Sequence, residues 1–416
     1  MHTSADNSVI VIGAGIIGIS IALELQAAGK SVCVLDRTGV AAGASAGNAG
    51  AFAFTDIVPL ATPGIMRKAP KWLLDPLGPL SIPPAYALKI APWMLRFWRA
   101  SWRGRYQASV SAQASLMELS RAALERQIKR VDGEHLMRRE GQLQLYQGER
   151  EFQASLPGWE LRKQKGISFE LLSCPGAIAE VQPGIDPCFT HAGFTPGWMN
   201  TVDPELWTQH LARAFTAAGG TIETVDTTAL QQGGEGVLVT TAKGLRRTPA
   251  AIVACGAFSG RLARTLGDRI PLETERGYNT TLPPGAFGLK THLTFGGHGF
   301  VVTRIGNGIR VGGAVELGGL NLPPNYKRAD ILLQKAGHFL PDLKTEGGTQ
   351  WMGFRPSLPD SLPVISRSAK APGVIYAFGH GHLGLTQSAG TAELVSSLLH
   401  RRPPPVSLDA FSAARF

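Results

Sequence analysis

The 416-residue sequence predicts a mixed α/β and α+β fold, in which a parallel-sheet domain is interleaved with a domain built on an antiparallel sheet. A short apolar strand at residues 9–12 leads into a glycine-rich turn and a helix, which is typical of parallel sheets buried on both faces. Between residues 270 and 320, apolar and polar residues alternate and glycines mark the turns, as in antiparallel strands. A chain of this length is expected to hold two closely joined domains.

The chain opens with a strand, a glycine-rich turn and a helix. Residues 9–12 form the strand, and residues 19–28 are expected to form the helix. In this spacing Gly13 permits the tight turn, Gly15 lets the backbone approach a pyrophosphate, and Gly18 lets the helix pack closely on the strand. The free N–H groups at the start of the helix would bind the phosphates. The expected contact residues are Ile12, Gly13, Ala14, Gly15, Ile16, Ile17 and Gly18.

A carboxylate follows the second apolar strand, residues 31–35. Asp36 lies 18 residues after Gly18, where its carboxylate can accept hydrogen bonds from a ribose diol. Arg37 leaves a ribose 2′-phosphate open as a ligand, although the Asp36 carboxylate would repel that phosphate. These residues predict a Rossmann-like dinucleotide site without separating FAD from NAD. The alternative is a glycine-rich turn in an unrelated βαβ unit.

Residues 66–106 form an unusual block that combines many basic residues with a single acidic residue, Asp75. Basic side chains mixed with tryptophan and leucine are typical of a segment at a membrane interface. The alternative is a buried helical excursion whose tryptophans pack on the core, and both interpretations stay open. Half of the chain's eight tryptophans lie in this block, namely Trp72, Trp93, Trp98 and Trp102.

The middle of the chain alternates helices with short strands. Helices are expected at residues 107–131, 203–218 and 327–340, and Asp203 caps the second of them with Pro204 in its first turn. A Gly-Gly turn after that helix predicts a β-hairpin.

Composition and charge exclude several classes of protein. The four cysteines lack paired spacing, which argues against a disulfide framework and against a zinc or other metal site. The polar N-terminus predicts no signal peptide, and the absence of an apolar run of about 18 residues predicts no membrane-spanning helix. The net charge of +10 leaves an anionic partner such as a membrane surface open, beside simple solubility. The protein is expected in the cytoplasm, with peripheral association at the inner face of the cytoplasmic membrane as the alternative.

Four segments, in order along the chain, resemble one known family. They are the opening glycine turn, VACGAFSG at 253–260, WMGFRPSLPD at 351–360 and AFGHGHLGLTQSAGTAELVSSLL at 377–399. Together they are similar to the FAD-dependent D-amino acid oxidase superfamily, and most of all to its D-amino acid dehydrogenase branch, which includes D-hydroxyproline dehydrogenases. The resemblance spans the whole chain. It implies FAD rather than NAD, because the closing loop and the helix after it would face the flavin pyrimidine carbonyl.

The resemblance also implies a domain division and further cofactor contacts. A discontinuous FAD-binding domain would comprise residues 1–60, 200–262 and 350–416, and a substrate-binding domain would comprise residues 61–199 and 263–349. Beside the opening turn, the implied cofactor contacts are Asp36, Arg37, Ser45, Asn48, Ala49, Gly50, Ala229, Gly256, Gly381, His382, Leu383, Gly384, Leu385 and Thr386.

The attachment of the flavin is expected to be noncovalent. Family members with covalent flavin use a histidine in the loop that matches residues 45–54 here, or a cysteine near the C-terminal motifs. Residues 45–54 contain no histidine, and no cysteine follows Cys255.

Three residues form the predicted catalytic set: Arg355, Tyr278 and His382. In the family, the arginine of the GFRP-like motif pairs with the substrate carboxylate, because a guanidinium presents two parallel donors to two oxygens. The alternative for Arg355 is a salt bridge at the end of a strand. Tyr278 matches a family tyrosine that covers the pocket or binds substrate, with a core tyrosine as the alternative. His382 and its neighbour His380 are expected beside flavin or substrate, with no proton transfer assigned to them.

The resemblance implies oxidation of a small D-amino acid, with D-proline and hydroxy-D-proline as cyclic candidates. Hydride would pass from Cα to the flavin N5, assisted by the lone pair of the neutral amine and without a dedicated side-chain base. A quinone or other respiratory acceptor would then take the electrons, or molecular oxygen in an oxidase of the glycine or sarcosine type. An RNA-modifying flavoprotein and a non-catalytic FAD-binding protein are the other classes. No nucleic acid partner is expected, because no RNA-binding module is found.

Overall fold

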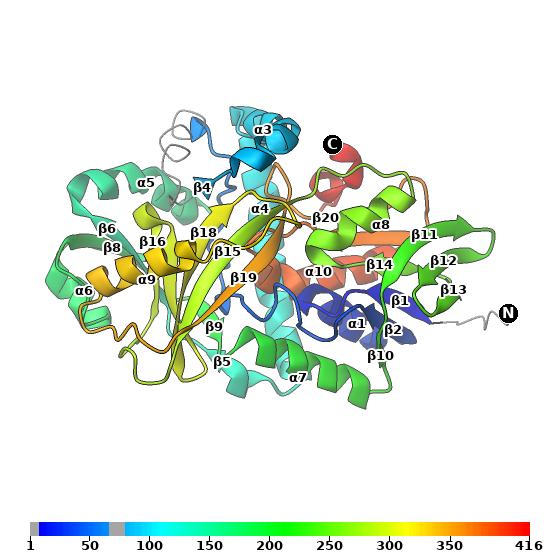
Figure 1. Ribbon diagram of the computed structural model, residues 1–416, viewed down its shortest axis with the longest axis horizontal. Coiled ribbons are helices and arrows are strands. Elements are labelled where there is room, and N and C mark those ends of the chain that lie inside the picture. Colours follow the sequence, from blue (N-terminus) through cyan, green and yellow to red (C-terminus); the bar gives the residue numbers. More distant parts are fainter. Residues whose placement is uncertain (1–7, 66–79) are drawn as a thin grey trace.

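The structure is a computed structural model that describes residues 8–65 and 80–416, and it shows two sheet-based halves side by side (Figure 1). One half is built on a six-stranded sheet and the other on a nine-stranded sheet. The first is mainly parallel and the second mainly antiparallel, so the predicted mixed fold is confirmed. Trp72 and Asp75 of the basic block lie outside the described residues.

The six-stranded sheet collects strands from distant parts of the chain. Its order is β10-β2-β1-β14-β21-β20, and its neighbouring strands are parallel apart from β20 and β21. Because β1 and β21 both pair with β14, the first and last parallel strands lie only one strand apart. The bounds are β1 Val9–Ile12, β2 Val32–Asp36, β10 Thr221–Thr224, β14 Ala251–Val253, β20 Val364–Arg367 and β21 Val374–Phe378.

Helices cover one face of this sheet. α1 (Ile16–Ala27) packs against α10 (Gly384–Leu399), while α7 (Pro204–Ala217) packs on α1 and α4 (Arg103–Arg130) packs on α10. A second apolar cluster fills the opposite face, beneath a small antiparallel sheet and one short helix. These elements are β11 Thr227–Gly233, β12 Gly236–Thr241, β13 Gly244–Thr248 and α8 Ser259–Thr265.

The residue types account for these elements. β1 buries all four of its residues, as expected for a strand covered on both faces. α1 begins at Ile16, three residues before its predicted start, because Gly15 is its N-cap and the end of the glycine turn is already helical. Asp203 caps α7 as predicted, by accepting the N–H groups of Glu205 at 2.7 Å and Leu206 at 3.1 Å.

The nine-stranded sheet forms the other half. Its main path is β19-β15-β18-β17-β16-β6-β8-β7, with β4 paired to β18. α9 (Lys327–Phe339) and α6 (Pro175–Val181) cover one face and bury apolar side chains such as Leu332 and Ile178 against it. The bounds are β4 Leu80–Ser81, β6 Gln142–Gln147, β7 Glu170–Leu172, β8 Phe189–Thr195, β15 Glu273–Leu282, β16 His292–Phe295, β17 Phe300–Ile305, β18 Gly308–Glu316 and β19 Thr349–Ser357.

The halves are connected by several chain crossings. A small sheet of order β3-β9-β5 lies between them, and α4 packs on α10 although it belongs to residues 61–199. The division of the chain into two domains by residue range therefore stays a prediction. Within residues 8–65 and 80–416, no helix is both long and apolar enough to cross a membrane. The remaining elements are β3 Ala51–Phe52, β5 Met137–Arg138, β9 Met199–Thr201, α3 Ala87–Ala100 and α5 Gly148–Gln164.

The contact between α1 and β1 depends on Gly18 having no side chain. A Cβ at Gly18 would lie 1.8 Å from the carbonyl oxygen of Gly13, so Gly18→Ala must push the helix away from the strand. We expect the free energy of unfolding to fall by about 1–3 kcal/mol, measured by urea denaturation. Gly234→Ala is the control, because a Cβ there would meet no atom within 4 Å. Equal stability of the two variants would contradict this account of the turn.

Candidate active site

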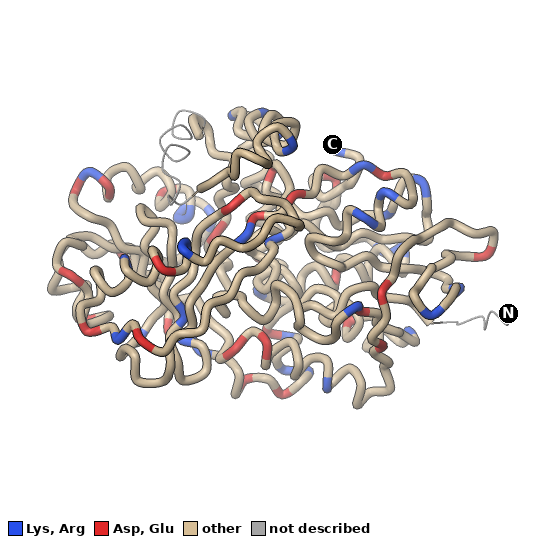
Figure 2. Tube along the Cα trace, viewed as in Figure 1, with Lys and Arg blue, Asp and Glu red and all other residues tan. Residues whose placement is uncertain are grey.

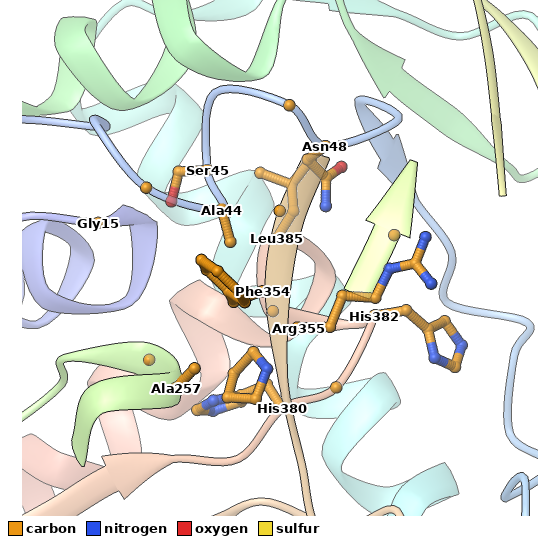
Figure 3. Close-up of a pocket in the computed structure, with 18 of the residues that line it drawn as sticks. Gly15, Ala44, Ser45, Asn48, Ala257, Phe354, Arg355, His380, His382 and Leu385 are labelled. Atoms are coloured by element: carbon orange, nitrogen blue, oxygen red, sulfur yellow. The ribbon is translucent and has the colours of Figure 1, made fainter. Parts of the chain in front are cut away.

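One cavity of about 770 Å³ lies between the two sheets, which is near the upper end for ligand sites. Its lining begins at the glycine turn after β1 and ends on the face of the nine-stranded sheet that α9 does not cover. Figure 3 shows this arrangement, with Gly15 and Ser45 at one side of the cavity and Arg355 and His382 at the other. The cavity therefore joins the two motifs that were predicted to bind nucleotide and substrate.

Asp36 and Ser45 fix the glycine turn. The Oδ2 atom of Asp36 accepts the N–H of Ala14 at 2.8 Å, and Ser45 Oγ accepts the N–H of Ile16 at 3.0 Å. Within the described part of the chain, the N–H groups of Gly15 and Ile17 face no acceptor, although both residues line the cavity. Such orphaned donors at the start of a helix are suited to a phosphate group.

Arg37 and Phe258 form a wall near the glycine turn. The guanidinium carbon of Arg37 lies 3.6 Å from the centre of the Phe258 ring, and both residues line the cavity. Arg37 thus contacts an aromatic ring at this end of the site.

The loop at residues 45–50 is held against the nine-stranded sheet. Nη1 of Arg310, on β18, donates to the carbonyl oxygens of Ala46 at 3.2 Å and Asn48 at 2.5 Å. Nδ2 of Asn279, on β15, donates to the carbonyl oxygen of Gly47 at 2.9 Å. These bonds fix the loop that forms one wall of the cavity between its two ends.

The closing glycine-rich loop reaches the same cavity from the other end of the chain. It follows β21 and leads into α10, whose first residues Gly384 and Leu385 line the cavity. Thr386 points away from the cavity, because its Oγ1 accepts the N–H of Ala53 at 3.0 Å and donates to the carbonyl oxygen of Ala51 at 3.4 Å. The Thr386 side chain therefore joins α10 to the segment around β3.

Arg355 lies at the substrate end on β19, the edge strand of the large sheet. Its Nη1 donates to the carbonyl oxygen of Ala314 at 2.9 Å, and its Nη2 to that of Gly313 at 3.5 Å. These carbonyls belong to a bulge in β18, where Ala314 has a φ of 58° and the register with β15 shifts. Gly277 of β15 makes room for the guanidinium, since a Cβ there would lie 2.4 Å from Nη2.

Burial changes the charge states at this end of the cavity. Burial lowers the pKa of Arg355, which the nearby Glu275 carboxylate partly offsets, and an arginine remains protonated at neutral pH. Burial also lowers the pKa of His382, although Asp56 and Glu275 oppose that shift, so His382 is neutral at pH 7. Burial lowers the pKa of His380 to about 3, and its Nε2 lies 3.0 Å from Thr391 Oγ1.

The hydroxyl group of Tyr278 does not face Arg355. It donates to Glu316 at 3.3 Å and accepts the N–H of Asn325 at 3.0 Å. The ring packs in the apolar cluster beneath α9, on the opposite face of β15 from Gly277. Tyr278 is among the residues that line the cavity, but its hydroxyl is held by Glu316 and Asn325, so the geometry favours the core interpretation and the catalytic role stays a prediction.

Most of the predicted cofactor residues line the cavity, and five do not. Ala14, Gly18, Gly50 and Thr386 shape the turn and the loops from behind. Ala229 is a correction: it lies on β11 opposite Thr240, outside the cavity. The residues that do line it are Ile12, Gly13, Gly15, Ile16, Ile17, Asp36, Arg37, Ser45, Asn48, Ala49, Gly256, Gly381, His382, Leu383, Gly384 and Leu385.

Sequence reasoning missed two groups of lining residues. The first is the segment Val225 to Thr227 after β10, which lies at the carboxyl edge of the parallel sheet where ligands bind. The sequence contained a signal for this segment. A loop that follows a parallel strand is a better candidate for a ligand contact than Ala229, which lies within the next strand. The second group is a polar wall on the large sheet, whose assembly from separate strands no local motif shows. It comprises Gln142, Gln144, Glu275, His292, Thr294 and Arg310.

Comparison with known proteins agrees with this geometry. Residues 8–398 match the family model described as FAD dependent oxidoreductase, or DAO. The chain belongs to this family. It is 34% identical to a D-amino-acid oxidase of Bradyrhizobium diazoefficiens and 30% identical to D-amino acid dehydrogenase 1 of Mesorhizobium japonicum, with 98% of this chain covered in both cases and 98% and 99% of those proteins.

Solved structures support the fold alone. Glycine oxidase from Geobacillus kaustophilus superposes with a TM-score of 0.78 at 21% identity, over 98% of both chains. L-proline dehydrogenase from P. horikoshii gives a TM-score of 0.76 at 18% identity, over 99% of this chain and 98% of the other. The family match and the curated relatives confirm the resemblance drawn from the sequence, and the protein is an FAD-dependent oxidoreductase.

The described residues fit FAD. Among the described residues, orphaned N–H groups occur at two separated places in the cavity, at Gly15 and Ile17 at the start of α1 and at Gly384 and Leu385 at the start of α10. The first set suits the pyrophosphate, and the second suits the polar edge of the flavin ring. Asp36 lies beside the first set, as a ribose-binding carboxylate requires.

Arg310 should control how firmly the cofactor is held. Arg310→Met removes both hydrogen bonds to the loop at residues 45–50 while keeping much of the side-chain volume. We expect the dissociation constant for FAD to rise about 10-fold or more, measured by flavin fluorescence after dilution. The control is Arg247→Met, because that arginine is exposed on β13 and pairs only with Glu235 among the described residues. Similar FAD retention in both variants would show that the loop does not depend on Arg310.

Proposed function

We propose that this protein oxidises the Cα–N bond of a small D-amino acid, with FAD bound noncovalently. The observation that carries the proposal is the Arg355 guanidinium, which lines the cavity at the end opposite the nucleotide turn and keeps donors beyond the two that bind backbone carbonyls. A carboxylate is the natural ligand of such a fork. The names of the curated relatives, D-amino-acid oxidase and D-amino acid dehydrogenase, support this substrate class.

The protein's own part in the reaction is binding and orientation. FAD, when bound, supplies a two-electron acceptor, and the redox chemistry belongs to it. Arg355 binds the substrate carboxylate, and the bulge carbonyls of Gly313 and Ala314 keep the guanidinium in place. His382 is neutral at pH 7 and lies in the same cavity without adding a positive charge beside Arg355. Positioning of this kind needs no side-chain base.

The polar wall favours a substrate whose side chain forms hydrogen bonds. Gln142 and Gln144 on β6 pair in register with His292 and Thr294 on β16, and all four line the cavity. A ring hydroxyl, as in hydroxy-D-proline, would find donors and acceptors there. Among cyclic candidates, the proposal therefore prefers hydroxy-D-proline to D-proline.

The proposal is tested by reducing the flavin anaerobically with D-alanine, D-proline, hydroxy-D-proline, glycine and sarcosine. The wild type should bleach with at least one D-amino acid. Arg355→Ala should lose apparent affinity about 10²- to 10³-fold, because the truncation removes a buried charged partner of the carboxylate. Arg355→Lys is the matched control, which should retain part of the affinity as a point charge.

An unchanged flavin spectrum with normal turnover in Arg355→Ala would refute the proposed carboxylate site. Bleaching by glycine or sarcosine alone would instead favour an oxidase of that type. Mixing the reduced enzyme with oxygen or with a soluble quinone then identifies the electron acceptor, and we propose the quinone.

An RNA substrate has less support. For residues 8–65 and 80–416, Figure 2 shows lysine and arginine interspersed with acidic residues, without the continuous basic stripe that an RNA-binding surface requires.

We also propose that α3 contacts a membrane surface, where a quinone would be reached. The helix lies at the periphery of the molecule (Figure 1), and Leu88 and Leu95 on it are 92% and 55% exposed. Trp98 and Trp102 follow at 42% and 49% exposure, with Arg96 and Arg99 nearby, whereas Trp93 is buried. The segment thus combines an inner packed side with an outer side of aromatic and basic residues.

The double variant Trp98→Ser/Trp102→Ser should bind vesicles of anionic phospholipid at least about 10-fold more weakly, in a sedimentation assay. Leu245→Ser is the control, since that residue is 49% exposed on β13. Equal binding by all three proteins, or none by the wild type, would contradict the membrane proposal without affecting the proposed reaction.

A further inference from the structure

Glu275 is a buried carboxylate in the substrate end of the cavity. Its residue is 4% exposed and lines the cavity from β15. It pairs directly with Arg355 of β19 in the antiparallel register. Side chains at directly paired positions lie on the same face with Cβ atoms about 4.5–5.5 Å apart. The cavity therefore presents a carboxylate beside the guanidinium.

Arg355 does not neutralise Glu275 by direct contact. Among the described residues, no nitrogen of Arg355 lies within 4.0 Å of a Glu275 oxygen, because the guanidinium extends over Gly277 toward the carbonyls of Gly313 and Ala314. Glu275 instead influences Arg355 and His382 through space. The Glu275 carboxylate and the Arg355 guanidinium therefore line the same cavity without pairing with each other.

Each of the other described carboxylates that line the cavity has a partner within the protein. Asp36 accepts backbone N–H groups, Asp56 lies 3.7 Å from Arg162, and Asp226 lies 3.1 Å from Arg261. Within the described part of the chain, Glu275 has no hydrogen-bond donor and no ion-pair partner. A buried carboxylate without a partner is costly, so a ligand that supplies a cation would be bound favourably there.

We propose that Glu275 binds the α-amino group of the substrate, while Arg355 binds its α-carboxylate. The ammonium and carboxylate groups of an amino acid zwitterion are bonded to the same carbon. The neighbouring strands β15 and β19 present the complementary groups, the Glu275 carboxylate and the Arg355 guanidinium, side by side. This inference rests on the proposed function and adds a selectivity: carboxylates with an α-amino group are accepted in preference to carboxylates without one. A neutral group at position 275 would remove that preference.

The test compares D-alanine with propionate, which has the same carboxylate but no amino group. D-alanine is measured by the concentration that half-saturates anaerobic flavin reduction, and propionate by its perturbation of the flavin spectrum. In Glu275→Gln, the half-saturating D-alanine concentration should rise at least about 30-fold. Propionate should bind as tightly as to the wild type or more tightly, because a negative charge near Arg355 has been removed.

Glu273→Gln is the matched control on the same strand. The Glu273 carboxylate accepts the Tyr86 hydroxyl at 2.9 Å and does not line the cavity, so both ligands should bind as to the wild type. Glu275→Asp keeps the charge on a shorter side chain and should weaken D-alanine less than Glu275→Gln does. It also serves if Glu275→Gln loses its fold, which thermal unfolding and flavin content report.

Each outcome of the test either supports or overturns the proposed role of Glu275. Unchanged D-alanine affinity in Glu275→Gln, or equal weakening of D-alanine and propionate, overturns the role of Glu275 and leaves the proposed function standing. A wild type that binds propionate but is reduced by no amino acid overturns the proposed function and this inference together. Selective loss of D-alanine affinity supports both.

Discussion

The parallel pairing of β1, β14 and β21 decides where every other part of the site lies. The three strands are adjacent, so their carboxyl ends share one edge of the sheet. The chain leaves that edge through the glycine turn into α1, through the segment around Gly256, and through the closing loop into α10. Two helix starts are thereby directed into one cavity from opposite ends of the sequence, as ligand sites of open α/β sheets require.

At the substrate end of the cavity, the position of Arg355 depends on a different feature, the bulge in β18. An extra residue at Ala314 breaks the register with β15 and leaves two carbonyl groups free to accept the guanidinium of Arg355. Gly277 and Gly353, paired across β15 and β19, provide the space that the arginine and Trp351 occupy. A buried cation is therefore held by backbone dipoles, and its remaining donors stay available for a ligand.

The two halves are held together by polar contacts as well as by apolar packing. Arg310 and Asn279 reach from the large sheet to the loop at residues 45–50, and Thr386 joins α10 to the segment around β3. These contacts make the walls of the cavity a product of both halves. Loss of a hydrogen bond from Arg310 or Asn279 on the large sheet would consequently weaken the attachment of the loop at residues 45–50.

The sequence by itself determined the opening strand, the glycine turn, Asp36 and the closing loop, because local spacing dictates turns, caps and helix starts. It also identified Arg355, whose motif is contiguous. Only the tertiary structure decided that Tyr278 turns its hydroxyl to Glu316, and that Glu275 faces the cavity without a partner. Strand register and a single-residue bulge set the face on which each side chain lies, and they arise from pairing between segments that are distant in the chain.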